Sequence, residues 1–203
     1  QLLDLATGQV RAVRAGLNPQ ARWGADVISR MEHAMAGEAA ALSDAINQGL
    51  SAMVLALFES TRLPWTELRK IAVVGNTVMQ HLMLGFPLEQ LAMAPHVPYT
   101  MEEQTRSTAE LGWHLPVDVP LRFLPNLGGF VGSDILGVIL ATRILESDVL
   151  VAAADLGTNG EIVAGSREGV LVSSTAAGPA FEGGRIEMGM RAGKGAISRV
   201  SVV

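Results

Sequence analysis

Residues 151–161 combine an apolar run, a glycine-bracketed turn and a second apolar run, and they constrain the fold more than any other stretch. The first run ends in Asp155, Gly157 and Gly160 enclose the turn, and an alternating segment resumes at Glu161. Glycine accepts the positive φ angles of tight turns, so the pattern predicts strand, turn, strand. Such a hairpin presents backbone N–H groups to an anion, beside a carboxylate that can hold a cation. A polyphosphate with Mg²⁺ needs this combination, and an ordinary glycine-rich hairpin is the competing interpretation.

Helical and strand patterns alternate along the rest of the chain, which predicts an α/β fold. We expect helices over residues 25–35, 38–61, 76–85 and 133–145, and strands over residues 1–6, 9–15, 70–74, 151–156, 161–165 and 169–173. Gly37 separates the first two helices, and a proline at position 64 closes the second. Residues 86–126 hold most of the prolines, so we expect loops with short strands there.

Two further turns join the hairpin in a candidate site. Residues 173–179 end a strand and enter a helix, with Gly178 just before a proline that suits the first helical turn. Gly75, Asn76 and Thr77 have the same strand-to-helix form, and the N–H groups at such helix starts bind anions. A simple helix cap is the alternative for each turn. The sequence has no Walker lysine motif and no Gly-x-Gly-x-x-Gly after a strand, which argues against a P-loop or a Rossmann site.

Charge and composition exclude several functional classes. The net charge is −5 and the 15 basic residues are scattered, so neither a nucleic-acid footprint nor a basic membrane-binding patch is predicted. No apolar run is long enough to cross a bilayer, and no signal peptide is present, so we expect a cytoplasmic protein. The absence of cysteine excludes disulfides, thiolate metal sites and ordinary iron–sulfur ligation within this chain. Without an initiator methionine, the chain is expected to be a piece of a longer protein.

Three blocks of the sequence resemble the signature motifs of the reductive activators of corrinoid proteins. These blocks are residues 155–161, 174–183 and 189–192. Further matching blocks lie upstream, at residues 18–20, 24–30, 74–77, 81–82 and 129–134. The resemblance therefore extends over nearly the whole chain.

The resemblance implies a ribonuclease-H-like ATPase fold of the actin and sugar-kinase type, shared with heat-shock chaperones and incomplete here at both ends. Residues 1–150 would form a first subdomain that lacks its first strand and carries an irregular insertion at 86–126. Residues 129–144 look like the helix that connects the subdomains. Residues 151–203 would begin a second subdomain, and residues 155–161 correspond to its phosphate-binding hairpin.

The same resemblance implies an activity for the parent protein. A full-length member carries an N-terminal two-iron ferredoxin domain and uses ATP to reduce a Co(II) corrinoid protein to Co(I), which restores methyl transfer. That cluster domain is missing from this chain, which by itself is expected to be inactive. A corrinoid protein is the implied partner, and some members are expected to form homodimers.

Roles for individual residues follow from the resemblance as well. Asp155 would hold Mg²⁺, and either Glu161 or Asp134 would orient the attacking water. The backbone N–H groups of Gly157, Thr158, Asn159 and Gly160 would bind the β- and γ-phosphates of ATP. Further candidate nucleotide contacts are Thr175, Gly178, Gly75, Asn76 and Thr77.

Two other interpretations stay open. One is an enzyme of the same fold with another task, either an ATPase activator of an acyl-CoA reductase or dehydratase, or a small-molecule kinase. Such an activator would place a cluster-binding cysteine near the glycine loop, and this chain has none; for a kinase, no substrate base or sugar pocket can be located in the sequence. The other is a non-catalytic docking or dimerisation module, built on residues 18–30 and 86–126, whose nucleotide motifs are vestigial.

Overall fold

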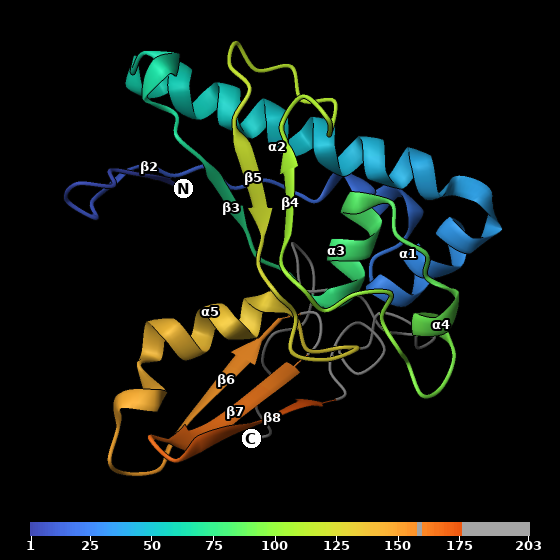
Figure 1. Ribbon diagram of the computed structural model, residues 1–203. Coiled ribbons are helices and arrows are strands. Elements are labelled where there is room, and N and C mark those ends of the chain that lie inside the picture. Colours follow the sequence, from blue (N-terminus) through green and yellow to red (C-terminus); the bar gives the residue numbers. More distant parts are fainter. Residues whose placement is uncertain (158–159, 176–203) are drawn as a thin grey trace, which may run out of the picture. The chain divides into compact units, whose positions relative to one another are not determined.

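The computed structural model describes residues 1–157 and 160–175 of the 203-residue chain (Figure 1). The chain forms two compact units, Gln1–Leu136 and Gly137–Val203. Helices and strands occur in both units, as the sequence pattern predicts.

The first unit contains β1 (Leu2–Leu3), β2 (Val10–Ala12), η1 (Pro19–Trp23), α1 (Val27–His33), η2 (Ala34–Glu38), α2 (Ala39–Thr61), η3 (Trp65–Glu67), β3 (Ile71–Val73), α3 (Thr77–Leu84), α4 (Glu89–Ala92), β4 (Gln104–Ser107) and β5 (Pro120–Phe123). Helix α5 (Ser133–Thr142) begins in the first unit and ends in the second. The second unit continues with η4 (Ile144–Glu146), β6 (Val151–Leu156), β7 (Gly160–Ser166) and β8 (Gly169–Thr175).

The long helical stretch of the first unit has the predicted break at Gly37. Asp26 caps its start by accepting a hydrogen bond from the Ser29 backbone N–H at 2.9 Å. At Gly37 the backbone has φ 104°, a conformation that glycine adopts without strain, so two helices meet there at a kink. Helix α2 ends where Arg62 adopts a left-handed φ of 55°, two residues before Pro64.

Residues Val27–Thr61 form a helical stretch of 35 residues, long enough to cross a membrane, that contains an 18-residue window with a mean hydropathy of 1.3. Polar bonds made by the middle of α2 point instead to the central helix of a globular unit. Asn47 is buried, donates to the Met83 carbonyl at 2.9 Å and accepts from Trp113 Nε1 at 2.9 Å. The Ser51 hydroxyl accepts from the backbone N–H of His114 at 3.2 Å.

The sheet of the first unit has the strand order β3-β5-β4, and α2 crosses one of its faces (Figure 1). β3 and β5 are parallel, with Ile71 opposite Leu121, whereas β4 and β5 are antiparallel, with Gln104 opposite Phe123. Leu121 and Phe123 are fully buried and pack with apolar side chains of α2 and α3. Residues 86–126 thus hold loops with short strands, as predicted, together with the single turn of α4.

The opening hairpin, β1 and β2, is present as predicted and borders an apolar groove. The groove is a cavity of about 220 Å³. Leu2 and Leu3 of β1 line one side, Ile71 of β3 lines another, and Leu57 and Phe58 of α2 contribute further lining. Among the described residues, β3 has a strand neighbour on one edge alone.

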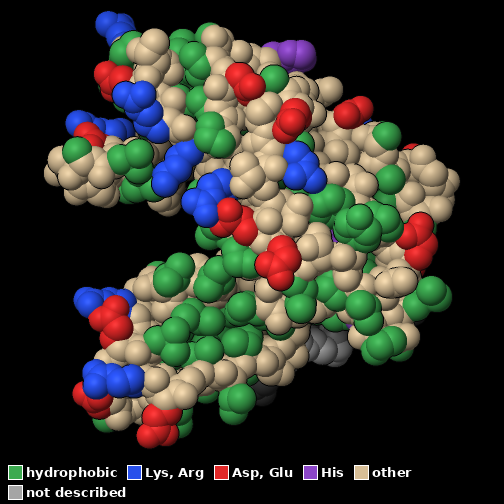
Figure 2. All heavy atoms as spheres, in the orientation of Figure 1, with side chains coloured by type: hydrophobic (Ala, Val, Ile, Leu, Met, Phe, Trp, Pro, Cys, Tyr) green, Lys and Arg blue, Asp and Glu red, His purple; other side chains and the backbone are tan. Residues whose placement is uncertain are grey.

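The second unit is built on the antiparallel sheet β6-β7-β8, which confirms the predicted strand, turn, strand at residues 151–165. The η4 turn packs against β7 and β8, where Ile144 and Val163 are buried. We call the face that carries Val163 the inner face and the opposite one the outer face. The outer face is apolar and open to solvent: Leu156 is 89% exposed and Leu171 is 81% exposed. Figure 2 shows hydrophobic side chains gathered over these strands.

Candidate functional site

Three polar side chains form one row at the end of the inner face, and we call Asp155, Glu161 and Ser174 the polar row. Strand pairing places Asp155 directly opposite Glu161, and Glu161 directly opposite Ser174. Residues that pair directly across antiparallel strands point to the same side of the sheet, so all three side chains share the inner face. The other rows of this face are apolar: Val151, Gly165 and Val170, and then Ala153, Val163 and Val172.

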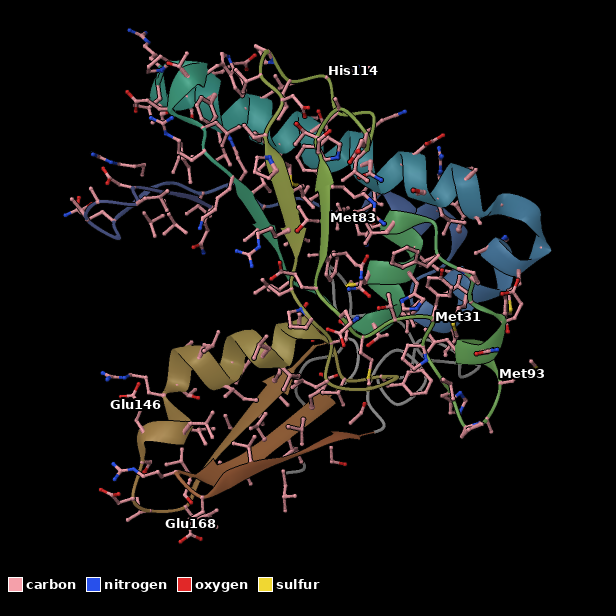
Figure 3. The ribbon with its side chains drawn as sticks, viewed as in Figure 1. Met31, Met83, Met93, His114, Glu146 and Glu168 are labelled. Atoms are coloured by element: carbon pink, nitrogen blue, oxygen red, sulfur yellow. The ribbon has the colours of Figure 1, made fainter. Side chains whose placement is uncertain are left out.

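The polar row lies where the strands meet the glycine turn. Asp155 is the last inner-face residue of β6 and is half-buried, while Glu161 at the start of β7 is only 6% exposed. The other end of the sheet is a solvated, ion-paired surface, where Arg167 Nη1 lies 3.0 Å from Asp148 Oδ1. Figure 3 labels Glu146 and Glu168 at that end. Asp155 and Glu161 are therefore less exposed than the charged end of the unit, whereas Ser174, the third member of the polar row, is exposed.

Two carboxylates directly opposite each other set the electrostatics of the polar row. Like charges at directly paired positions repel and destabilise a sheet, and a bound cation removes that repulsion. Carboxylate and hydroxyl oxygens are the hard ligands that Mg²⁺ prefers. The described residues contain no group of three or more His, Asp or Glu side chains that could hold a metal ion unaided. A Mg²⁺ ion bound with phosphate is usually held by only one or two protein carboxylates, and the polar row contains two, Asp155 and Glu161.

The predicted phosphate-binding turn is only partly described. Gly157 forms a bend after β6, and Gly160 opens β7 opposite both Leu156 and Thr175. Thr158, Asn159 and Gly178 lie outside the described residues. The assignment of the turn amides to phosphate binding therefore stays a prediction.

The second predicted turn, at Gly75, Asn76 and Thr77, forms the N-terminus of α3 as expected. Asn76 caps the helix, because its Oδ1 accepts a hydrogen bond from the Met79 backbone N–H at 2.9 Å. The Thr77 hydroxyl is fully buried and donates to the Gly128 carbonyl at 2.6 Å. Both side chains therefore make structural bonds, and a nucleotide contact at this turn would come from its backbone.

The start of α5 is fixed against the same turn. The Ser133 backbone N–H donates to the Gly75 carbonyl at 3.0 Å, and the Ser133 hydroxyl bonds to both backbone groups of Gly75 at 3.2 Å. A Cβ atom at Gly132 would lie 2.2 Å from the Gly75 carbonyl oxygen, so this approach requires glycine. Asp134 follows directly and is half-buried. The structure thus brings Asp134 together with Gly75 and Asn76 in the first unit, whereas Asp155 and Glu161 belong to the second.

A buried polar network supports this junction, and sequence reasoning did not find it. The Ser133 N–H donates to Asn126 Oδ1 at 3.3 Å, and Asn126 Nδ2 donates to Gln80 Oε1 at 2.7 Å. Gln80 is fully buried, and its Nε2 has no hydrogen-bond partner within the part of the chain that the structure describes. Gln80 lies 46 positions before Asn126 in the sequence, so no local pattern could reveal their contact. A glutamine on the apolar face of a helix was the one available signal.

His81 is a structural residue of α3. Its Nδ1 lies 2.8 Å from the Thr77 carbonyl, and its Nε2 accepts the backbone N–H of Tyr99 at 3.0 Å. The ring is fully buried, and burial lowers the pKa of His81 below its usual value, against an opposing effect of the Thr77 hydrogen bond. These bonds require a neutral imidazole with its proton on Nδ1, because Nε2 must accept.

We expect the free energy of unfolding to fall as the pH drops below the ordinary histidine pKa of about 6.5. Below that pH, His81 is protonated in the unfolded chain but stays neutral in the folded protein. The contribution of neutral His81 to the free energy of unfolding is therefore fully present above pH ~6.5 and is lost on acidification. The slope contributed by one group is at most about 1.4 kcal/mol per pH unit. Urea denaturation of His81→Gln and His114→Gln variants between about pH 7.5 and 5.5 measures it. Only the His81 substitution should flatten the slope, and an unchanged slope in that variant would contradict the assignment.

The chain matches known proteins over nearly its whole length. A family model described as the RACo middle region matches residues 1–147, and one described as the C-terminal domain of RACo, the ASKHA domain, matches residues 149–203. The corrinoid activation enzyme RamQ of Eubacterium limosum is 32% identical over 203 residues, which cover 98% of this chain and 34% of that protein. The Co(II) methylated amine-specific corrinoid protein reductase of Methanosarcina barkeri is 25% identical over 211 residues, covering 98% of this chain and 38% of that protein.

A solved structure is similar as well. It is a reductive activator for corrinoid,iron-sulfur protein, with a TM-score of 0.82 and 32% sequence identity, covering 98% of this chain and 32% of the other. The chain thus spans about a third of the length of the relatives that it matches.

Proposed function

Because this chain belongs to the RACo family, we propose a place for it in a longer protein. It forms the middle region and the start of the nucleotide-binding domain of an ATP-driven activator of corrinoid proteins. The parent protein returns an inactive Co(II) corrinoid protein to Co(I). The observation that carries the proposal is the order of the two family models, which match consecutive parts of one chain, residues 1–147 and 149–203. The ASKHA match and the solved relative also confirm the actin-like α/β ATPase fold class expected from the sequence.

In this proposal the polar row holds the magnesium ion of the nucleotide. Asp155 is the ligand, directly or through water, because its half-buried carboxylate ends the strand beside the glycine turn. Mg²⁺, when bound, neutralises charge on the phosphate oxygens. In the proposal, the backbone N–H groups of the turn at 157–160 bind those oxygens. Thr175, directly opposite Gly160, and Gly178 are further proposed contacts.

Glu161 is the better of the two candidates for orienting the attacking water. It shares the inner face with Asp155 and pairs directly with it across the strands. Asp134 lies at the start of α5, where its Oδ1 also accepts the backbone N–H of Ile135 at 2.9 Å. That bond is typical of a residue that stabilises a helix start, so we assign Asp134 to holding the helix rather than to water. Asn76 and Thr77 remain proposed nucleotide contacts through their backbone N–H groups. The N–H and carbonyl of Gly75 are bonded to Ser133, so Gly75 would contribute only a close approach of the chain to the nucleotide.

The groove beside β3 supports the proposed subdomain division, in which residues 1–150 form a first ribonuclease-H-like subdomain without its first strand. An unpaired strand edge presents N–H and C=O groups that can bind a further strand. The apolar lining from β1, β3 and α2 would bury the side chains of a strand inserted there. Such a strand would join the β1-β2 hairpin to the sheet of β3, β5 and β4. Residues 151–203 would then begin the second subdomain.

The remaining parts of the proposal concern the whole protein. Its partner is a corrinoid protein, its electrons pass through a two-iron ferredoxin cluster in a separate N-terminal domain, and it acts in the cytoplasm. A homodimer is proposed by analogy with family members.

A reductive activation assay of the full-length protein tests the proposal. We expect ATP and a low-potential reductant together to convert a Co(II) corrinoid protein to Co(I), followed by the absorption of the cobalt centre, and we expect no conversion without ATP. Calorimetric titration with Mg-ATP is the companion measurement. Binding without corrinoid reduction would favour another activator or a kinase of this fold, and the absence of binding would favour a docking module.

A further inference from the structure

We propose that Gln80 contacts the nucleotide, and that its Nε2 amino group joins the N-terminus of α3 in binding a phosphate oxygen. This inference rests on the proposed function, in which the turn before α3 contacts the nucleotide. Gln80 lies near the start of that helix in the first unit and is fully buried. It would give the site a side-chain donor in addition to its backbone N–H groups.

Two successive hydrogen bonds fix the orientation of the Gln80 amide. The Ser133 N–H donates to Asn126 Oδ1 at 3.3 Å, which leaves the Nδ2 group of Asn126 to face Gln80. That Nδ2 group donates to Gln80 Oε1 at 2.7 Å. A reversed Gln80 amide would bring two donor groups together, so Nε2 points away from Asn126. The Nε2 group is therefore a donor held in one orientation by a backbone N–H.

This oriented donor has no acceptor among residues 1–157 and 160–175. A buried donor without an acceptor destabilises a folded protein, because it loses its hydrogen bonds to water and gains none. Native proteins therefore keep few such groups, and each of them requires an explanation. An oxygen atom of a bound molecule would satisfy the Nε2 group of Gln80.

The start of α3 supplies backbone donors near Gln80. Asn76 accepts the Met79 N–H with its side chain at 2.9 Å and the Gln80 N–H with its carbonyl at 3.1 Å. The N–H groups of Thr77 and Val78 have no acceptor inside the helix. Side chains of a helix lean toward its N-terminus, so the Gln80 amide lies over this first turn. The positive end of the helix dipole favours an anion there, and phosphate oxygens accept hydrogen bonds from such donors.

The turn before α3 borders the surface of the first unit. Val74, directly before the turn, is 49% exposed. Gly128, whose carbonyl accepts the Thr77 hydroxyl at 2.6 Å, is half-buried. A phosphate group would approach the donors from this side.

Two substitutions remove the Nε2 donor by different routes. Gln80→Met keeps an unbranched side chain of similar length and deletes the amide. Asn126→Asp leaves Gln80 intact, but a carboxylate only accepts: one oxygen keeps the Ser133 N–H, and the other draws the Nε2 group of Gln80 toward itself. Gln90→Met is the matched control, because Gln90 is an exposed glutamine on α4 of the same unit.

Calorimetric titration of the full-length variants with Mg-ATP tests the inference, and thermal unfolding without ligand shows which variants are folded. We expect Kd to rise about tenfold in Gln80→Met and in Asn126→Asp, as for the loss of one hydrogen bond to a charged acceptor. The double variant should bind no more weakly than Gln80→Met, because its donor is already absent. Gln90→Met should bind Mg-ATP as tightly as wild type.

Several outcomes would overturn the inference. Wild-type affinity in a folded Gln80→Met protein would leave the Nε2 group to a buried water, and wild-type affinity in Asn126→Asp would contradict its role even if Gln80→Met does not fold. An equal loss in Gln90→Met, or additive losses in the double variant, would show that the substitutions do not act through one donor. A wild-type protein that does not bind Mg-ATP would overturn the proposed function itself, and the role of Gln80 with it.

Discussion

Replacement of Asp155 by alanine in the full-length protein is expected to lower ATP hydrolysis by about a hundredfold or more, because the proposed site then loses its magnesium ligand. The fold should survive. Asp155 stands directly opposite the buried Glu161, so the substitution removes a like-charge pair from the sheet rather than a favourable contact. Steady-state hydrolysis, together with thermal unfolding, separates the loss of activity from a loss of structure.

Asp148→Ala is the matched control for Asp155→Ala. Asp148 is also a carboxylate of the second unit, but it is exposed and forms a surface ion pair with Arg167 at 3.0 Å. Exposed pairs contribute little, so we expect hydrolysis within about twofold of wild type. Undiminished turnover in Asp155→Ala would remove this residue from the mechanism. The same loss in both variants would indicate a general effect of charge on the unit.

Gly132→Ala is expected to destabilise the protein by about 3 kcal/mol or more, the largest effect on stability that we predict. The added Cβ would lie 2.2 Å from the Gly75 carbonyl oxygen and 2.3 Å from the Asn76 Cα. Both atoms belong to backbone that Ser133 holds in place, so neither can yield without breaking those hydrogen bonds. A melting temperature lower by about 10 °C would accompany the change.

Gly137→Ala, inside helix α5 that Gly132 directly precedes, is expected to have the opposite effect. A Cβ at Gly137 meets no atom within 4 Å, and alanine has the higher helix propensity. This variant should be more stable than wild type by about 0.5–1 kcal/mol. Urea denaturation of both variants measures the difference. If Gly132→Ala were as stable as Gly137→Ala, the close packing of α5 on the Gly75 turn would be incorrect.

Local sequence patterns predicted the structural features that depend on residues close together in the sequence. The Asn76 cap, the kink at Gly37 and the hairpin around Gly157 depend on residues within a few positions of each other, and the structure has all three. The same applies to the end of α2 before Pro64. Each of these features follows from turn, cap or φ-angle chemistry that a single sequence displays.

Contacts between residues that are far apart in the sequence could not be predicted from local patterns. The parallel pairing of Ile71 with Leu121 joins segments 50 positions apart, and β5 lies in a proline-rich region with little strand signal. The hydrogen bond between Asn126 and Gln80 is a second example. The place of Ser174 opposite Glu161 is a third example, because it depends on the register of β7 and β8.

The open outer face of β6, β7 and β8 has a practical consequence for biochemistry on isolated pieces of this protein. A broad apolar surface of this kind promotes self-association and precipitation at the concentrations used for crystallography or NMR. Because neighbouring residues of a strand face opposite sides, Leu156 and Leu171 can be made charged without touching the inner face. Substitutions that raise solubility can thus be made on the outer face independently of the polar row on the inner face.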